Sequence, residues 1–131
     1  PYAGLSDSTI VKVPPEIANK ISRVSATEFN IERSAVDQIL EKQSSLFRRV
    51  KLRPVKEGDK VTGLRVSRIR RGSLFETLGM KNGDELRTIN GFDLTNPQRA
   101  LEAYGRLRTA KKLKLSVNRN GSPVTIEFNI Q

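Results

Sequence analysis

The sequence contains no cysteine and no histidine, and these two absences exclude several kinds of chemistry. Without cysteine the chain has no thiol nucleophile and no disulfide bond. Without histidine it lacks the side chain that most often exchanges protons near neutral pH, and the usual ligand sets for zinc are missing as well. A serine nucleophile with a lysine base is the best remaining catalytic route, but no serine carries the glycine pattern of a strained nucleophile elbow. We therefore expect a protein that is not an enzyme, with no catalytic residue, no metal and no cofactor.

Long apolar runs are missing too. No segment approaches the roughly 20 apolar residues that a membrane-spanning helix needs. The chain starts with Pro1 and not with methionine, so we expect it to be a piece of a longer protein whose membrane anchor or signal lies outside it. At 131 residues it is long enough for one hydrophobic core, and we expect one domain with an appendage.

Positive charge is abundant but unevenly distributed. The formal net charge is +10, and the segment from 48 to 71 holds ten lysines and arginines against Glu57 and Asp59, a net charge of +8 (ten minus two). Such a segment improves solubility and also attracts acidic protein surfaces, phosphates or anionic lipid. No aromatic residue lies in this segment, so base stacking has no support there. Binding of nucleic acid or of an acidic surface stays open as an alternative function, which a steep salt dependence would indicate.

The most specific pattern lies in residues 71–94, which combine a short capped helix with two tight turns. Ser73 and Glu76, three positions apart, form a capping-box pattern, and Gly79 lies where a helix ends. Two Asn-Gly pairs then flank a short apolar segment and predict turns on both sides of a strand. We interpret Asp84 as a carboxylate that caps a turn, not as an acid catalyst.

The N-terminal part is predicted to form a hairpin and a helix after a linker. Residues 21–24 and 28–32 have strand-like character, with Phe29 and Ile31 alternating with polar residues, and they predict two short strands. Ser34 is predicted to cap the helix that follows, and the apolar stripe of this helix is predicted to pack on the rest of the protein. We divide the chain into a linker with little order over 1–16, an appendage over 17–53 and a domain over 54–131.

The C-terminal part is predicted to form a helix and a second hairpin. Thr95 or Asn96 caps the helix, with Pro97 in its first turn. Strict alternation at 113–117 and 124–130, on both sides of an Asn-Gly turn, predicts two antiparallel strands. Together these elements predict an α+β fold.

In this order the elements resemble the PDZ domains of bacterial envelope proteins, and within that group the inner-membrane C protein of type II secretion systems. The resemblance covers roughly Ile17 to the end and begins ahead of the PDZ core. The matching positions there are Ile31, Arg33, Ser34, Val36, Asp37, Ile39 and Leu40. The resemblance implies a small antiparallel β-sandwich or partly open barrel capped by two helices, with the permuted strand order of bacterial members and an N-terminal hairpin and helix.

The resemblance implies a protein-recognition module on the periplasmic face of the inner membrane that contributes to export across the outer membrane. The implied partners are the secretin, the inner-membrane platform and exported substrates, and a homo-oligomer stays open. The secretin-binding homology region of the family would lie upstream, so secretin binding is assigned to no residue of this chain. An alternative is the peptide-binding PDZ module of an HtrA-type periplasmic protease, which a catalytic domain would precede.

In a PDZ domain a partner segment adds to a sheet edge beside a long helix. The carboxylate-binding loop of familiar members reads GLGF, and the equivalent here is Gly63 to Val66, with Arg65 in place of the second glycine. Two binding modes stay open: the loop could capture a free C-terminus, or an internal segment could dock with charge pairing. The same apolar pattern also fits a helix that packs against the sheet as part of the core and leaves no groove. The expected binding residues are Gly63, Leu64, Arg65, Val66, Ser67, Arg68, Ala100, Tyr104 and Leu107.

Overall fold

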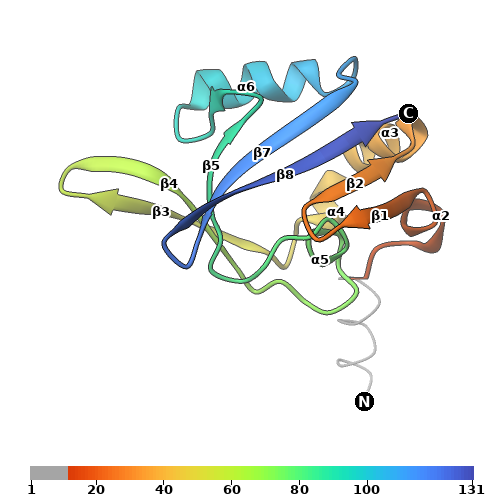
Figure 1. Ribbon diagram of the computed structural model, residues 1–131, viewed down its shortest axis with the longest axis horizontal. Coiled ribbons are helices and arrows are strands. Elements are labelled where there is room, and N and C mark those ends of the chain that lie inside the picture. Colours follow the sequence, from red (N-terminus) through yellow and green to blue (C-terminus); the bar gives the residue numbers. More distant parts are fainter. Residues whose placement is uncertain (1–11) are drawn as a thin grey trace.

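The computed structural model describes residues 12–131, which form a mostly antiparallel sheet with helices around it (Figure 1). In chain order the elements are α2 (Pro15–Ala18), β1 (Ile21–Ser25), β2 (Glu28–Ile31), α3 (Arg33–Glu41), α4 (Gln43–Leu46), β3 (Lys51–Glu57), β4 (Lys60–Ser67), α5 (Leu74–Thr77), β5 (Glu85–Ile89), β6 (Phe92–Asp93), α6 (Pro97–Arg106), β7 (Lys112–Arg119) and β8 (Ser122–Ile130). The predicted α+β fold, including the N-terminal hairpin and helix, is confirmed.

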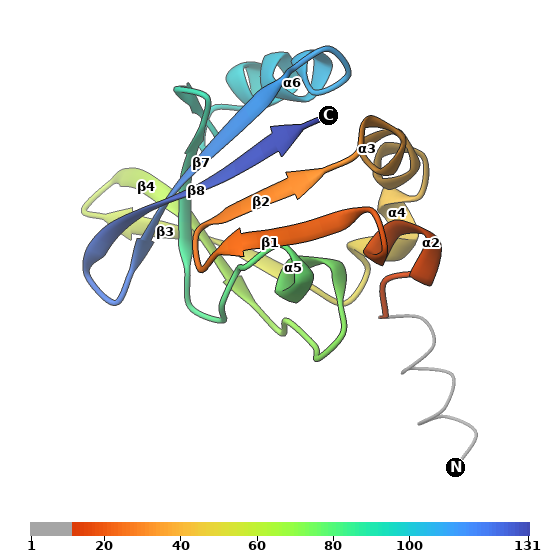
Figure 2. The same ribbon diagram turned by 45° about the vertical axis from the view of Figure 1, so that its right-hand side comes forward.

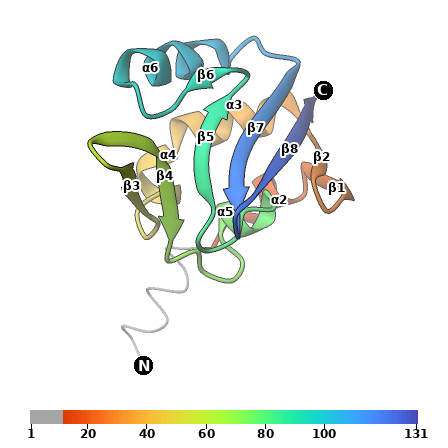
Figure 3. The same ribbon diagram turned by 60° about the vertical axis from the view of Figure 1, so that its left-hand side comes forward.

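The sheet is eight-stranded, open and mixed. Its strand order is β1-β2-β8-β7-β5-β4-β3, with β6 paired to β5 beside this path. The pair β2–β8 is parallel, with Phe29 opposite Phe128, whereas the hairpins β1–β2, β3–β4 and β7–β8 are antiparallel. Figure 2 shows the hairpin β1–β2 continuing the sheet beside β8, and Figure 3 shows β3 and β4 at the other end of the sheet. The two end strands of this path are therefore β1 and β3.

The expected linker is only partly described, because residues 1–11 lie outside the described residues. From Val13 onward the segment contacts the rest of the protein. The Val13 N–H donates to the Gly72 carbonyl at 2.9 Å, and Ile17 in α2 is completely buried. The expected boundary between Arg53 and Pro54 falls inside β3, so appendage and domain share one sheet and one core.

Local signals place most helix ends where the sequence predicts them. Ser73 accepts the Glu76 N–H at the start of α5, and the Glu76 carboxylate accepts the Gly72 N–H at 2.7 Å. Gly79 follows α5 with a φ of +84°, and a β-carbon there would lie 2.7 Å from the ring of the buried Phe29. Both constraints favour glycine at this position.

The predicted cap of α3 is wrong. This helix begins at Arg33, one residue before Ser34, and its N-cap Glu32 makes no side-chain hydrogen bond. The apolar stripe does pack on the rest of the protein as predicted. Val36 belongs to the core, and Ile39 and Leu40 pack against it.

The prediction for Asp84 is confirmed, since its carboxylate accepts the Lys81 N–H at 2.9 Å across the turn. The sequence did not reveal its second partner. Arg119 donates from Nε at 2.8 Å and from one terminal nitrogen at 2.7 Å, and Asp84 is only 1% exposed. This hydrogen-bonded pairing raises the pKa of the Arg119 guanidinium and fixes the turn before β5 against β7.

Candidate protein-recognition site

The strand that carries most of the expected binding residues is not a sheet edge. β4 lies between β3 and β5, and Arg65 is in register with Arg53 on one side and with Glu85 on the other. The Val66 N–H also donates to the Asp84 carbonyl at 2.9 Å. A partner strand cannot add to a backbone that is already paired on both sides. The expectation of an open edge at this strand is therefore wrong, and the open edge nearest to these residues is β3.

Gly63 makes room for a side chain of the protein itself. A β-carbon at this position would lie 2.5 Å from Cγ of Glu85, whose side chain crosses β4 here. Glu85 is 7% exposed, and its carboxylate accepts hydrogen bonds from Thr62 Oγ1 and Arg87 Nε, both at 3.2 Å. The sequence suggested that a ligand carboxylate would approach the backbone at Gly63. In the structure the carboxylate of Glu85, a residue of the protein itself, occupies this position.

We predict that Gly63→Ala destabilises the protein by about 1–3 kcal/mol, because the added methyl group displaces the Glu85 side chain from its two partners. Urea denaturation would measure the change. The matched control is Gly105→Ala in α6, where nothing lies within 4 Å of the added carbon, and there we expect a gain of about 0.4–1 kcal/mol. Equal effects of the two substitutions would contradict this account of Gly63.

The other expected residues of β4 differ in how accessible they are. Val66 is completely buried in the core, and Leu64 is half-buried against it. Arg65 and Arg68 are exposed, and Ser67 is half-buried. Of these five residues, Leu64, Arg65, Ser67 and Arg68 leave surface for a partner to contact, and Val66 does not.

The helix predicted near the site is α6, and Asn96 caps it as expected. The Asn96 side chain accepts the N–H groups of Gln98 and Arg99 at 2.9 and 3.3 Å. Ala100 is half-buried, whereas Leu101 is 71% exposed. The helix therefore keeps accessible surface, although residues that precede β3 contact its Tyr104 and its C-terminal end.

Tyr104 and Leu107 contact the leading segment, by which we mean the described residues before β3, with the leading helices α3 and α4. The Tyr104 hydroxyl accepts a hydrogen bond from Gln43 Nε2 at 3.2 Å, and Gln43 begins α4. Leu107 lines an apolar cavity together with residues of α3. The leading helices thus cover part of the surface that the sequence suggested for a ligand.

Arg33 fixes this arrangement. Its guanidinium donates to the carbonyls of Leu107 at 3.1 Å, of Arg108 at 2.8 Å and of Ala110. These carbonyls lie at the C-terminal end of α6, where a positive charge is favourable and where helix carbonyls lack partners. The contact joins α3 to α6 across 74 to 77 positions of sequence.

We predict that Arg33→Met destabilises the protein by about 2 kcal/mol, because it removes charge-assisted hydrogen bonds while keeping most of the apolar stem. Thermal denaturation followed by circular dichroism measures the loss. Arg108→Met is the control, since it removes the same charge from an exposed side chain nearby. An equal loss of stability in the two variants would show that the Arg33 contacts do not hold α6 in place.

The apolar cavity has a volume of about 190 Å³ and lies between the leading helices and the sheet. Its lining comes from α3, α5, β5, β7 and β8 and includes Ile39, Leu40, Phe75, Ile89, Leu113 and Phe128. Phe47 closes one side, with its ring edge-on to Phe75 at 5.1 Å between centroids. The cavity is suited to an apolar group and offers almost no polar contact.

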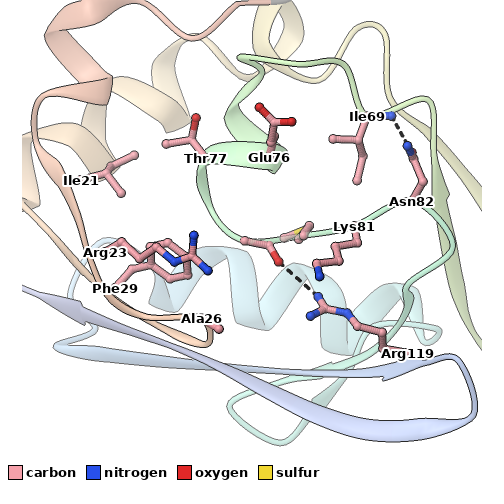
Figure 4. A pocket seen from close by; sticks show the side chains of 12 residues that line it. Ile21, Arg23, Ala26, Phe29, Ile69, Glu76, Thr77, Lys81, Asn82 and Arg119 are labelled. Carbon is pink, nitrogen blue, oxygen red and sulfur yellow. Dashed lines mark hydrogen bonds between the residues drawn. The ribbon is translucent and has the colours of Figure 1, made fainter.

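A second cavity of about 600 Å³ lies between β1, α5 and the turn before β5 (Figure 4). Its floor includes the buried Phe29, and Arg23, Lys81 and Arg119 bring positive charge to its walls. In Figure 4 Arg119 donates to the carbonyl of Gly79, at 3.1 Å. Arg119 is already engaged by Asp84, so its charge is partly neutralised.

A third depression, of about 540 Å³, lies on the β3–β4 hairpin. It is lined by Arg53, Pro54, Val55, Lys56, Arg65 and Ser67. Two of the expected binding residues, Arg65 and Ser67, thus lie in one concave surface together with the open edge strand. Sequence reasoning missed the β3 residues because the alternation of a strand predicts which face is buried and not which strand lies at the edge.

Neither a membrane span nor a metal cluster is found in the part of the chain that the structure describes. Within residues 12–131 no helix is long and apolar enough to cross a membrane. Over the same range no three acidic residues come together in a way that could hold a metal ion.

Comparison with known proteins identifies relatives in one family, although no family model matches the chain. The type II secretion system protein C of Vibrio cholerae is 29% identical over 129 residues, which cover 97% of this chain and 42% of that protein. The chain thus spans about two fifths of the length of this relative.

Three solved structures are similar. The PDZ domain of EpsC from Vibrio cholerae, residues 204–305, is 30% identical with a TM-score of 0.54, and the match covers 73% of this chain and 91% of that one. A shorter piece of EpsC, residues 219–305, is 33% identical with a TM-score of 0.50 and coverages of 64% and 97%. The PDZ domain of pullulanase C protein from Klebsiella pneumoniae, in complex with fatty acid, is 29% identical with a TM-score of 0.51 and coverages of 72% and 97%. The resemblance predicted from sequence is confirmed, and the chain belongs to the family of type II secretion system protein C, of which it carries the PDZ domain region.

Proposed function

We propose that this chain is a non-enzymatic protein-recognition module of a type II secretion system, placed on the periplasmic face of the inner membrane and contributing to export across the outer membrane. Family membership supports the secretion context. The observation that carries the recognition role is the edge strand β3, because within residues 12–131 no strand pairs with its outer side. An extended partner segment can add to such an edge through backbone hydrogen bonds.

The contact residues that we propose follow from what stays accessible. Leu64, Arg65, Ser67 and Arg68 lie next to β3 on its hairpin partner or just after it, and Ala100 and Tyr104 on α6 are half-buried. Gly63, Val66 and Leu107 support the site from within, since each packs against the protein itself. The partners that we propose are the secretin, the inner-membrane platform or exported substrates. The relatives give no support to an HtrA-type protease.

The backbone of β3 allows a sharp test. Pro54 has no N–H, and proline in a sheet is confined to positions where the missing donor does not face the paired strand. Leu52 lies two residues earlier on the same strand and is 49% exposed. Because backbone groups alternate in direction along a strand, its N–H points away from β4, as the nitrogen of Pro54 does. Leu52→Pro therefore removes an outward donor, whereas Leu52→Ala keeps it and removes only the side chain.

We expect Leu52→Pro to lower the recovery of secretin and platform proteins from a periplasmic extract about fivefold, the effect of one lost hydrogen bond, and Leu52→Ala to lower it much less. Quantitative mass spectrometry of the bound fraction gives the measurement. Secretion of an exported enzyme by cells whose protein C carries each substitution gives the readout in the full-length protein. Unchanged recovery with a folded Leu52→Pro variant would show that these partners do not bind the edge of β3.

The apolar cavity supports a second candidate activity, the binding of an acyl chain. The solved pullulanase C domain is described as a complex with fatty acid, and the cavity here is larger than the apolar cavities of about 150 Å³ that hold benzene. Its lining offers an acyl chain a dry apolar surface between α3 and the sheet.

For this second candidate we expect Ile39→Phe to weaken the binding of dodecanoate, because the larger ring fills the cavity. Isothermal titration calorimetry measures the affinity. Val24→Phe on β1, where the side chain is 54% exposed and lines no part of the cavity, is the control and keeps the wild-type affinity. Equal binding by the two variants would place any fatty acid elsewhere.

A further inference from the structure

Two arginines face each other on the β3–β4 hairpin. Arg53 on β3 and Arg65 on β4 are directly opposite in the antiparallel register, and both side chains are exposed. Residues opposite each other point to the same face, with β-carbons about 4.5–5.5 Å apart, and like charges in this arrangement destabilise a sheet. The fold itself does not require such a pair.

No group in residues 12–131 neutralises these two charges. Neither guanidinium makes a hydrogen bond or an ion pair with any described residue. The acidic residue beside them is Glu85, which is in register with Arg65 on β5. Its carboxylate is buried and already accepts from Thr62 and Arg87. Both arginines are therefore available to an external anion.

The pair lies in a concave surface beside an open backbone. Arg53 and Arg65 line the depression of about 540 Å³ together with Val55, Lys56 and Ser67, and the outer side of β3 has no partner strand in the described chain. Figure 3 shows the hairpin at the end of the sheet opposite to β1. We call these residues and the outer side of β3 the basic edge.

We propose that the basic edge recognises an acidic, extended segment of a partner protein, which adds to β3 by backbone hydrogen bonds and places its carboxylates against Arg53 and Arg65. The inference rests on the proposed function for the location of the site and adds the chemistry of the partner. Carboxylates match the planar guanidinium group, which binds them in a bidentate manner.

Other anionic partners fit the basic edge less well. A nucleic acid would gain no base stacking, because the hairpin residues 51–67 include no aromatic side chain. A lipid surface would use the charges but leave the open backbone without partners. A second copy of this chain carries the same net charge of +10 and would bring further like charges to the same edge.

The experiment uses a synthetic peptide of alternating glutamate and threonine, labelled for fluorescence anisotropy, and the whole chain. We expect Arg53→Thr with Arg65→Thr to weaken binding at least about tenfold, and raised salt to weaken binding to the wild type. Threonine suits a strand, so the double variant keeps or exceeds the wild-type melting temperature as the like-charge repulsion is lost. Arg23→Thr is the matched control, since Arg23 is an exposed arginine on the other edge strand of the same sheet, and it binds as wild type does.

Two further binding measurements distinguish strand addition from attraction by charge alone. A peptide methylated at alternate backbone nitrogens keeps its charge and loses its donors, and we expect it not to bind. A peptide with lysine in place of glutamate should bind the charge-reversed protein, Arg53→Glu with Arg65→Glu, and not the wild type. Binding of the methylated peptide, or wild-type affinity in the Thr double variant, would overturn the proposal.

Tighter binding of phosphatidylglycerol vesicles or of single-stranded DNA than of the acidic peptide would overturn it in favour of those partners. The outcome is separable from that of the proposed function. If the acidic peptide does not bind but Leu52→Pro still lowers the recovery of secretion proteins, the edge is a recognition site and the acidic chemistry is wrong.

Discussion

The contact between Arg33 and the end of α6 determines how the leading segment joins the PDZ domain. The guanidinium reaches the carbonyls of Leu107, Arg108 and Ala110, while the Arg33 N–H donates to the Gln131 carbonyl at 2.7 Å. One residue thus ties the start of α3 both to the end of the long helix and to the chain after β8. Because the leading segment is held there, α3 lines the apolar cavity and Gln43 at the start of α4 reaches Tyr104. The hairpin and helix therefore pack on the PDZ domain and share its core.

This arrangement has a consequence for recognition. At one end of the sheet, α3, α4 and the hairpin β1–β2 cover the core, and Tyr104 is engaged from within the chain. At the other end the β3–β4 hairpin keeps an open edge and exposed cations. The surface that we propose for a partner therefore lies on the strand before the expected one, which shifts the proposed site by one strand without changing the family.

Local features of this fold could be predicted from sequence, and non-local ones could not. The Ser73 and Asn96 caps, the Asp84 turn and the hairpin around Asn120 depend on residues within a few positions of one another. By contrast, the role of Gly63 depends on Glu85, and the parallel pair β2–β8 joins residues about a hundred positions apart. Alternation in a strand predicts which face is buried but carries no information on its neighbours, so β4 could be recognised as a strand and still be mistaken for an edge. The Arg33 contact was visible only as a family match, because nothing near it in sequence predicts carbonyl partners.

The basic edge also explains how an open strand can persist without pairing with a second copy of the chain. An unpaired edge can bind a second copy of the same chain, and proteins limit this with charge and with proline on the edge strand. Here Pro54 interrupts the row of outward donors, and Arg53 and Arg65 repel any neighbour of the same composition. These features oppose self-pairing but not pairing with an acidic segment, for which the same charges are attractive. Solubility and specificity are therefore not competing explanations of the positive charge at this edge: the repulsion that keeps copies apart selects partners of opposite charge.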